Sequence, residues 1–333
     1  MDLTGLSNEQ LAGQRLMAGF EGLELNPALR FLIDTLKVGG IILFSRNIST
    51  PNQLTLLCSA MQDYARACGQ PALFIAVDQE GGQVARLKEP FTRFPGNPYM
   101  KNESDAIRFA QITAAELSKV GINMDMAPVL DVAPENISSV MAGRAFGHDP
   151  LWVSKLGNLV IQHLQENRIL SVAKHFPGIG RTTRDSHSEL PTAEVDFNTL
   201  KTTDLVPFQA AIERKVAGIM LSHIRFTGID PRWPASLSVK VAKDLLRKDL
   251  GFDGLIFTDD LDMGAVKKHF DIRTVIRRLL LAGIDIALIC HSRADMETAF
   301  EEIVKDLESS PKQKKKCVAS VQRIMEFKRQ YLS

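Results

Sequence analysis

Residues 174–191, which read KHFPGIGRTTRDSHSELP, combine side chains that can move protons with residues that break regular structure. Lys174 and His175 end an apolar run, and Asp185 precedes His187 by two positions. An aspartate at that spacing can accept a hydrogen bond from one imidazole nitrogen, which fixes the tautomer and leaves the other nitrogen free to transfer a proton. The same pair can equally stabilise the loop, so the spacing alone leaves both interpretations open.

Ionisable residues also stand at the ends of other short apolar runs. Asp78, Asp131, His223 and the pair Asp259-Asp260 end such runs, and His291 directly follows the last run. Polar residues are common at strand ends because these ends are exposed to solvent. Six ends that carry Asp, His or a Lys-His pair nevertheless favour an active site. Asp259 is expected to face into that site. Asp260 is expected to point to the other side of its strand in a supporting role, because side chains alternate along a strand.

Eight short apolar runs alternate with segments of helical periodicity, and most of the runs contain no regular polar alternation. Such runs are typical of parallel strands that are buried on both faces. Strand–helix alternation repeated eight times predicts a TIM (β/α)8 barrel, as a single α/β domain over residues 1–333, with its active site at the C-terminal ends of the strands. An open doubly wound sheet is the alternative, but no glycine fingerprint follows the first run. The runs are residues 15–20, 39–44, 72–78, 122–131, 169–175, 217–223, 254–260 and 284–290.

Helical periodicity is clear at residues 50–67 and 104–120. Residues 316–332 place Val318, Val321, Ile324 and Met325 at helical spacing, which predicts a helix packed on the outside of the barrel. The lysine-rich residues 312–316 are interpreted as the solvated start of this helix.

The bulk composition is that of an ordinary globular protein, with 45% apolar and 24% charged residues and a net charge of +1. This charge gives no reason to expect nucleic acid or an anionic membrane as a partner. No apolar run reaches the ~18 residues of a membrane span, and the N-terminus lacks a signal-peptide pattern. The four cysteines have no metal-binding spacing, so free thiols are expected. We therefore expect a cytoplasmic protein. We also expect a monomer.

Metal-dependent catalysis is disfavoured, because the first run carries no histidine pair and Asp185-Ser186-His187 lacks the helical HExxH spacing. A phosphate site has only Gly264-Ala265 as a weak candidate. The remaining chemistry is acid–base catalysis with a carboxylate nucleophile and with no metal or cofactor.

The pattern KHFPGxGxxxxDSHxxLP resembles glycoside hydrolase family 3, because DQEGGxVxRL and RAFG precede it and TDDLDM follows it. The segments GGIILFSRN (39–47) and MAPVLDV (126–132) extend the resemblance, which runs from about Leu11 to His291. Within the family, the chain is similar to the single-domain bacterial β-N-acetylglucosaminidases, or β-hexosaminidases, of the NagZ type. Several motifs in the same order make the resemblance specific.

The resemblance implies a TIM barrel that removes terminal GlcNAc from peptidoglycan fragments during cell-wall recycling. These fragments carry GlcNAc linked to anhydro-N-acetylmuramic acid, with or without a peptide. In the implied retaining mechanism Asp259 is the nucleophile, His187 is the proton donor and acceptor, and Asp185 orients His187. Retaining glycosidases usually use two carboxylates, and the DSH triplet marks the family's histidine instead. The residues implied to bind sugar hydroxyls are Asp78, Arg86, Arg144, Lys174 and His175.

Two positions depart from the family pattern. Ile179 stands where many relatives have a second histidine in KHFPGHG, and Thr258 stands where serine is common. Nothing in the residues themselves fixes recognition of a 2-acetamido group. A β-glucosidase or β-xylosidase of the same family therefore remains an alternative, as does a non-catalytic sugar-binding barrel.

Overall fold

Eight parallel strands close into a barrel in chain order, as the sequence predicts. The computed structural model describes residues 5–183 and 190–332. Each strand pairs with its neighbours in sequence, and the last strand closes on the first. The TIM-barrel prediction is confirmed, and each barrel strand lies within one of the eight predicted runs or exceeds it by one residue. The strands are β1 (Leu16–Ala18), β2 (Gly40–Leu43), β3 (Phe74–Val77), β6 (Met124–Asp125), β7 (Leu170–Phe176), β9 (Gly218–Leu221), β11 (Leu255–Asp260) and β12 (Ile286–Ile289).

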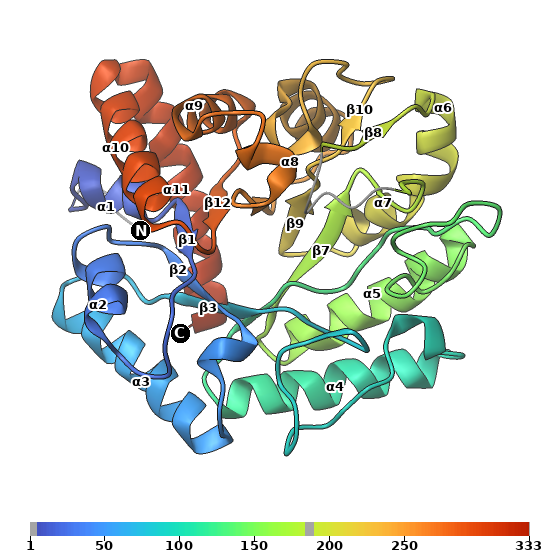
Figure 1. Ribbon diagram of the computed structural model, residues 1–333, viewed down its shortest axis with the longest axis horizontal. Helices are drawn as coiled ribbons and strands as arrows, with labels where there is room; N and C mark the ends of the chain where they lie inside the picture. Colours follow the sequence, from blue (N-terminus) through green and yellow to red (C-terminus); the bar gives the residue numbers. More distant parts are fainter. Residues whose placement is uncertain (1–4, 184–189, 333) are drawn as a thin grey trace.

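The helices follow one another in chain order around these strands (Figure 1). Helices α3 (Pro51–Ala67) and α4 (Glu103–Lys119) match the two predicted periodic segments within about a residue. The other helices outside the strands are α2 (Pro27–Asp34), α5 (Pro150–Glu166), α6 (Phe197–Thr199), α7 (Val206–Glu213), α8 (Gly264–Lys267), α9 (Ile272–Ala282) and α10 (Arg293–Ser309). Helix α1 (Asn8–Gly13) precedes β1, and α11 (Pro311–Leu332) ends the chain. Two π-helical segments are η3 (Leu200–Asp204) and η5 (Lys240–Asp249), and 3-10 turns are η1 (Ser45–Asn47), η2 (Asn97–Tyr99) and η4 (Ala235–Leu237).

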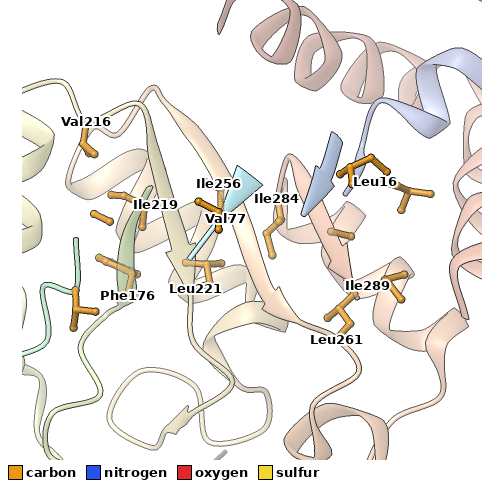
Figure 2. Close-up of a cluster of buried hydrophobic side chains, with 14 of the residues drawn as sticks. Leu16, Val77, Phe176, Val216, Ile219, Leu221, Ile256, Leu261, Ile284 and Ile289 are labelled. Carbon is orange, nitrogen blue, oxygen red and sulfur yellow. The ribbon is translucent and has the colours of Figure 1, made fainter. Parts of the chain in front are cut away.

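Successive residues of the strands enter two different cores, because side chains alternate across a sheet. One set packs outward against the helices, and Figure 2 shows part of it; it includes Leu16, Val77, Ile219, Leu221, Ile256 and Ile289. The other set fills the barrel and includes Met17, Phe74, Val172, Met220, Phe257 and Leu288. This division extends beyond the strand ends and decides which side chains reach the mouth of the barrel.

Helix α11 lies outside the sheet, as predicted, and crosses the N-terminal end of the barrel. Its Ile324 and Tyr331 join the core inside the barrel. Lys328 Nζ donates to Gln14 Oε1 at 2.6 Å and lies 5.2 Å from the centre of the Phe74 ring, at the start of β3. The helix therefore closes the bottom of the barrel and leaves the opposite mouth open.

A buried carboxylate ties this helix to the sheet. Asp285, which immediately precedes β12, accepts hydrogen bonds from Ser320 Oγ at 2.7 Å and from Arg323 Nη1 at 2.6 Å. It also accepts from the Arg247 guanidinium and from the Ile256 backbone N–H. The lysine-rich start of α11, in contrast, is mostly exposed, as expected.

Two small sheets stand apart from the barrel. A hairpin of β4 (Gln79–Gly81) and β5 (Val84–Ala85) follows β3, and β8 (Thr192–Ala193) pairs with β10 (Arg225–Phe226). Neither was predicted from the sequence. In the described part of the chain, no helix combines the length and apolar character that a membrane crossing requires.

Candidate active site

The open mouth of the barrel contains a cavity of about 380 Å³. It lies at the C-terminal ends of the strands, where TIM-barrel active sites are found. Part of its lining continues the inward-facing positions of the strands by two residues, namely Phe44, Asp78, Lys174, Asp259 and Cys290. Met220, an inward-facing residue of β9, also lines the cavity.

Lys174 is the centre of a buried charge network in this cavity. Its ammonium group lies 2.7 Å from Asp78 Oδ1 and 2.7 Å from Glu80 Oε1. Burial opposes all three charges, but the two carboxylates raise the pKa of Lys174. In turn, Lys174 and Arg86 lower the pKa of Asp78, and Lys174 and Arg144 lower that of Glu80. The network therefore remains charged at neutral pH and presents both donors and acceptors to a ligand.

Two arginines complete this network. Arg144 donates to both oxygens of Glu80, at 2.9 Å and 2.7 Å, and the acidic neighbours, Glu80 foremost, raise its pKa despite its burial. Arg86 donates to Asp78 Oδ2 at 3.2 Å. Paired guanidinium and carboxylate groups hold one another in fixed orientations, because each makes directional hydrogen bonds.

The β4–β5 hairpin positions Asp78, Glu80 and Arg86. Gln79 Oε1 accepts from the backbone N–H groups of Arg86 and Leu87, at 2.9 Å and 3.0 Å. The Gln79 backbone N–H donates to Asp125 Oδ1 at 2.9 Å. Burial raises the pKa of Asp125 well above its usual range, and this hydrogen bond joins the start of the hairpin to β6.

His175 is oriented by a carboxylate from the neighbouring segment of the barrel. Its Nδ1 lies 2.7 Å from Asp131 Oδ2, and its Nε2 lies 3.4 Å from Arg144 Nη2. Asp131 Oδ1 also accepts from the backbone N–H of Ile179 at 2.8 Å. Asp131 therefore fixes both the ring of His175 and the start of the loop that follows β7.

Asp259 is placed at the end of β11 with one carboxylate oxygen held. Its Oδ1 accepts from the Asp260 backbone N–H at 2.8 Å, and no described residue bonds its Oδ2. Asp260 also borders the cavity, contrary to the expectation from simple alternation, because the β11–β12 pairing shifts register between Phe257 and Asp260. Asp260 Oδ1 accepts from the backbone of Asp262 and Cys290, which suits the supporting role expected of it.

The structure brings together Asp78, Arg86, Arg144, Lys174, His175 and Asp259, all of which the sequence singled out. Asp185 and His187 lie outside the described residues. Sequence reasoning missed Glu80 as a member of the site and Asp131 as the partner of His175. The signal for Glu80 was its position two residues after Asp78, which places both carboxylates on one side of the chain.

The isoleucine that departs from the family pattern contributes a wall of the cavity. The Ile179 side chain is buried and lines the site, while its backbone N–H donates to Asp131. The backbone contact does not depend on the residue type, so the substitution changes the polarity of the wall and keeps this hydrogen bond. Within residues 5–183 and 190–332, no group of three or more His, Cys, Asp or Glu is arranged to hold a metal ion.

Comparison with known proteins identifies the family. Residues 9–327 match the model described as the N-terminal domain of glycosyl hydrolase family 3. The chain is 37% identical over 285 residues to a β-hexosaminidase from Nitrosomonas eutropha, covering 83% of this chain and 80% of that protein. The chain therefore belongs to glycosyl hydrolase family 3. Within this family it groups with the β-hexosaminidases, which confirms the predicted family and enzyme class.

Solved structures agree with this assignment. A family 3 β-N-acetylglucosaminidase from Paenibacillus sp. str. FPU-7 superposes with a TM-score of 0.95 at 35% identity, covering 98% of this chain. This chain spans 63% of the Paenibacillus protein. NagZ from Neisseria gonorrhoeae, solved with N-trifluoroacetyl-D-glucosamine, superposes with a TM-score of 0.74 at 28% identity, covering 93% of this chain and 98% of that one.

Proposed function

We propose that this chain is a retaining exo-β-N-acetylglucosaminidase with Asp259 as its nucleophile. The observation that carries the proposal is the position of Asp259, which borders a cavity whose other walls hold the Asp78, Lys174 and Arg86 charges. A carboxylate with one oxygen held by a backbone N–H has its other oxygen available to attack a sugar carbon. The cavity volume suits one terminal sugar.

The reaction proceeds in two steps. In the first, Asp259 attacks the anomeric carbon, the bond to the leaving group breaks, and His187 donates a proton to the departing oxygen. In the second, His187 accepts a proton from water, and the water oxygen displaces Asp259 from the sugar. Asp185 orients the His187 ring, and its charge favours the protonated form required in the first step.

The sugar is held by the charged residues around it. Asp78 accepts from hydroxyl groups, and Arg86, Arg144 and Lys174 donate to them. His175, whose tautomer is set by Asp131, offers Nε2 to the same site. Charge-assisted hydrogen bonds of this kind are stronger than neutral ones, which supports selection for a polar sugar.

We infer that the substrates are peptidoglycan fragments with a terminal GlcNAc, hydrolysed in the cytoplasm by a monomeric enzyme as part of cell-wall recycling. The names of the relatives support the sugar: β-hexosaminidase, β-N-acetylglucosaminidase and a structure that holds an N-acylated glucosamine. The resemblance of the sequence motifs to NagZ-type enzymes supports the process.

The proposal is tested by hydrolysis of 4-nitrophenyl β-N-acetylglucosaminide beside the matching β-glucoside and β-xyloside, with wild type and with Asp259→Asn. We expect release from the acetamido sugar, and a loss of at least about 1,000-fold in the variant, because a neutral amide is a poor nucleophile. Faster hydrolysis of the glucoside or xyloside would contradict GlcNAc as the terminal sugar of the substrate. Failure of the folded wild type on all three would favour a binding protein.

The role of His187 is tested separately with leaving groups of different acidity. His187→Ala should lose much more activity on a disaccharide than on the 4-nitrophenyl glycoside, because 4-nitrophenolate leaves without needing a proton. Equal activity of the variant and the wild type on both substrates would contradict the acid–base assignment.

A further inference from the structure

A second and larger pocket lies beside the catalytic cavity. Its volume is about 740 Å³, against about 380 Å³ for the cavity that contains Asp259. It lies between the β4–β5 hairpin and the segment that includes Arg93 and Tyr99. A single sugar is accommodated by the smaller cavity, so the larger pocket has room for a ligand portion that exceeds one sugar.

The two hollows share a wall. Gln83 and Arg86 line both of them, and the turn that holds Met141 and Arg144 on the catalytic side holds Gly143 on the other. A Cβ atom at Gly143 would lie 3.1 Å from Gln83 Nε2, so the Gln83 side chain packs closely against this turn. A substrate whose terminal sugar occupies the catalytic cavity can therefore extend across Gln83 into the second pocket.

Hydrogen bonds join the segments that form the second pocket. Gly82 N–H donates to Phe94 O at 2.9 Å, which joins the hairpin to the following segment. Asn97 Nδ2 donates to Arg144 O at 2.8 Å. Preorganised walls reduce the entropy that a bound ligand must lose.

The charges of the pocket have one sign. Lys88 and Arg93 are exposed at its rim, Arg86 contributes to its inner wall, and no acidic side chain lines it among the described residues. Lys88 and Arg93 have no carboxylate partner among these residues, whereas Arg86 pairs with Asp78 inside the catalytic cavity. Two unpaired cations at the edge of a concave surface attract a ligand that carries carboxylates.

We propose that this pocket binds the carboxylate-bearing part of the aglycone, with Lys88 and Arg93 as the residues that select for its charge. The inference rests on the proposed function, since it requires a glycoside in the catalytic cavity. An acidic peptide attached to the second sugar has the required size and charge. The pocket thereby makes the enzyme prefer a peptide-bearing glycoside with free carboxylates over the same glycoside without them.

The test compares three substrates with the same terminal GlcNAc. The first is a GlcNAc-anhydro-N-acetylmuramic acid peptide, the second is the same compound with its carboxylates converted to amides, and the third is 4-nitrophenyl β-N-acetylglucosaminide. Each is assayed with wild type, with Lys88→Ala/Arg93→Ala and with a control of equal charge, Arg108→Ala/Lys243→Ala. The control residues are exposed and line neither pocket.

We expect the pocket variant to lose roughly five- to thirtyfold in kcat/KM on the acidic substrate, mainly through KM. On the amidated and 4-nitrophenyl substrates, kcat/KM of the pocket variant should stay within about twofold of the wild-type value. The control variant should stay within the same range on all three substrates. Added salt should lower kcat/KM of the wild type on the acidic substrate alone, because exposed charges are screened.

Two results would overturn the inference and leave the proposed function standing. One is an equal loss of kcat/KM by the pocket variant on the acidic and amidated substrates. The other is no loss of kcat/KM by this variant on either substrate, while the wild type hydrolyses the 4-nitrophenyl glycoside. Wild type that hydrolyses none of the three substrates would contradict the proposed function itself, and the inference with it.

Discussion

Arg144 holds Glu80 through two hydrogen bonds, from Nε to Oε2 at 2.9 Å and from Nη2 to Oε1 at 2.7 Å, although the residues are 64 positions apart. The Glu80 side chain is only 2% exposed. A second cation, Lys174, lies 2.7 Å from the same Oε1 atom. This carboxylate therefore offsets the buried charge of Lys174 and the partly buried charge of Arg144, both of which line the catalytic cavity.

Glu80→Gln should destabilise the protein and weaken substrate binding. The amide keeps the shape but removes the charge, and breaking a buried ion pair costs about 3–5 kcal/mol. Urea unfolding measures the loss, and KM for 4-nitrophenyl β-N-acetylglucosaminide should rise. Glu297→Gln is the control, because its pair with Arg293 is exposed on α10 and should contribute less than about 1 kcal/mol. Equal unfolding midpoints for the two variants would contradict the role of Glu80.

Asp131→Asn should lower activity without removing the cavity. The Asp131 carboxylate accepts a hydrogen bond from His175 Nδ1. This bond orients the ring so that Nε2 faces the cavity. An amide at this position can also donate, so the ring loses its fixed orientation, and kcat/KM should fall by up to about 100-fold. The amide oxygen can still accept from Ile179 N–H, so the melting temperature should change much less than the activity. A variant with unchanged kcat/KM and an unchanged pH profile would refute the assignment.

Lys328→Met should stabilise the protein, and more so at pH 7 than at pH 9. Burial lowers the pKa of Lys328 from 10.5 to about 7. At pH values between these two, the unfolded chain binds a proton that the folded chain does not. The free energy of unfolding of the wild type therefore falls by about 1.4 kcal/mol for each pH unit as the pH falls from 10.5 to 7. The penalty is absent above 10.5 and constant below 7.

Urea unfolding of wild type and Lys328→Met at the two pH values measures this effect. The advantage of the variant should be about 2–3 kcal/mol greater at pH 7 than at pH 9. The lost hydrogen bond to Gln14 lowers the advantage by a similar amount at both values. Lys312→Met, at the exposed start of α11, should show no such difference. An advantage of Lys328→Met that did not vary with pH would contradict a neutral buried amine.

Iodoacetamide should leave the enzyme active at pH 8, although Cys290 lines the catalytic cavity. Burial, and then the charge of Asp260, raise the pKa of Cys290 well above its usual range, and only the thiolate is a strong nucleophile. Burial also raises the pKa of Cys58 to about 12. Cys68 is the partly exposed thiol, so peptide mapping should find the label there first. Rapid inactivation with the label on Cys290 would show that this thiol is accessible and ionised.

The barrel could be predicted because its strands carry their own signal. Runs such as 254–260 and 284–290 are short and mostly apolar without regular polar alternation, a pattern typical of parallel strands covered on both sides. The order of the strands then followed from the regular alternation with helices. The ends of the same runs placed Asp78, Lys174 and Asp259 at one mouth of the barrel, without any knowledge of distances.

The sequence could not predict which side chains contact one another across distant segments of the chain. Nothing near Glu80 in the chain indicates that Arg144 and Lys174 meet it, because those contacts join segments far apart in sequence. The side of Asp260 was missed because a register shift is a property of two paired strands. The periodicity of α11 revealed an apolar face, but its position across the bottom of the barrel depends on Phe74 and Asp285, which lie elsewhere in the chain.

The most direct test of the proposed chemistry is to trap the glycosyl-enzyme and locate it. A 5-fluoro-β-N-acetylglucosaminyl fluoride should accumulate on the protein, because ring fluorination slows both steps while the fluoride leaving group favours the first. Intact-mass measurement followed by peptide mapping should find one sugar on the peptide that contains Asp259, and none on the Asp259→Asn variant. A sugar on another residue, or continued turnover of substrate with no covalent species, would contradict Asp259 as the nucleophile.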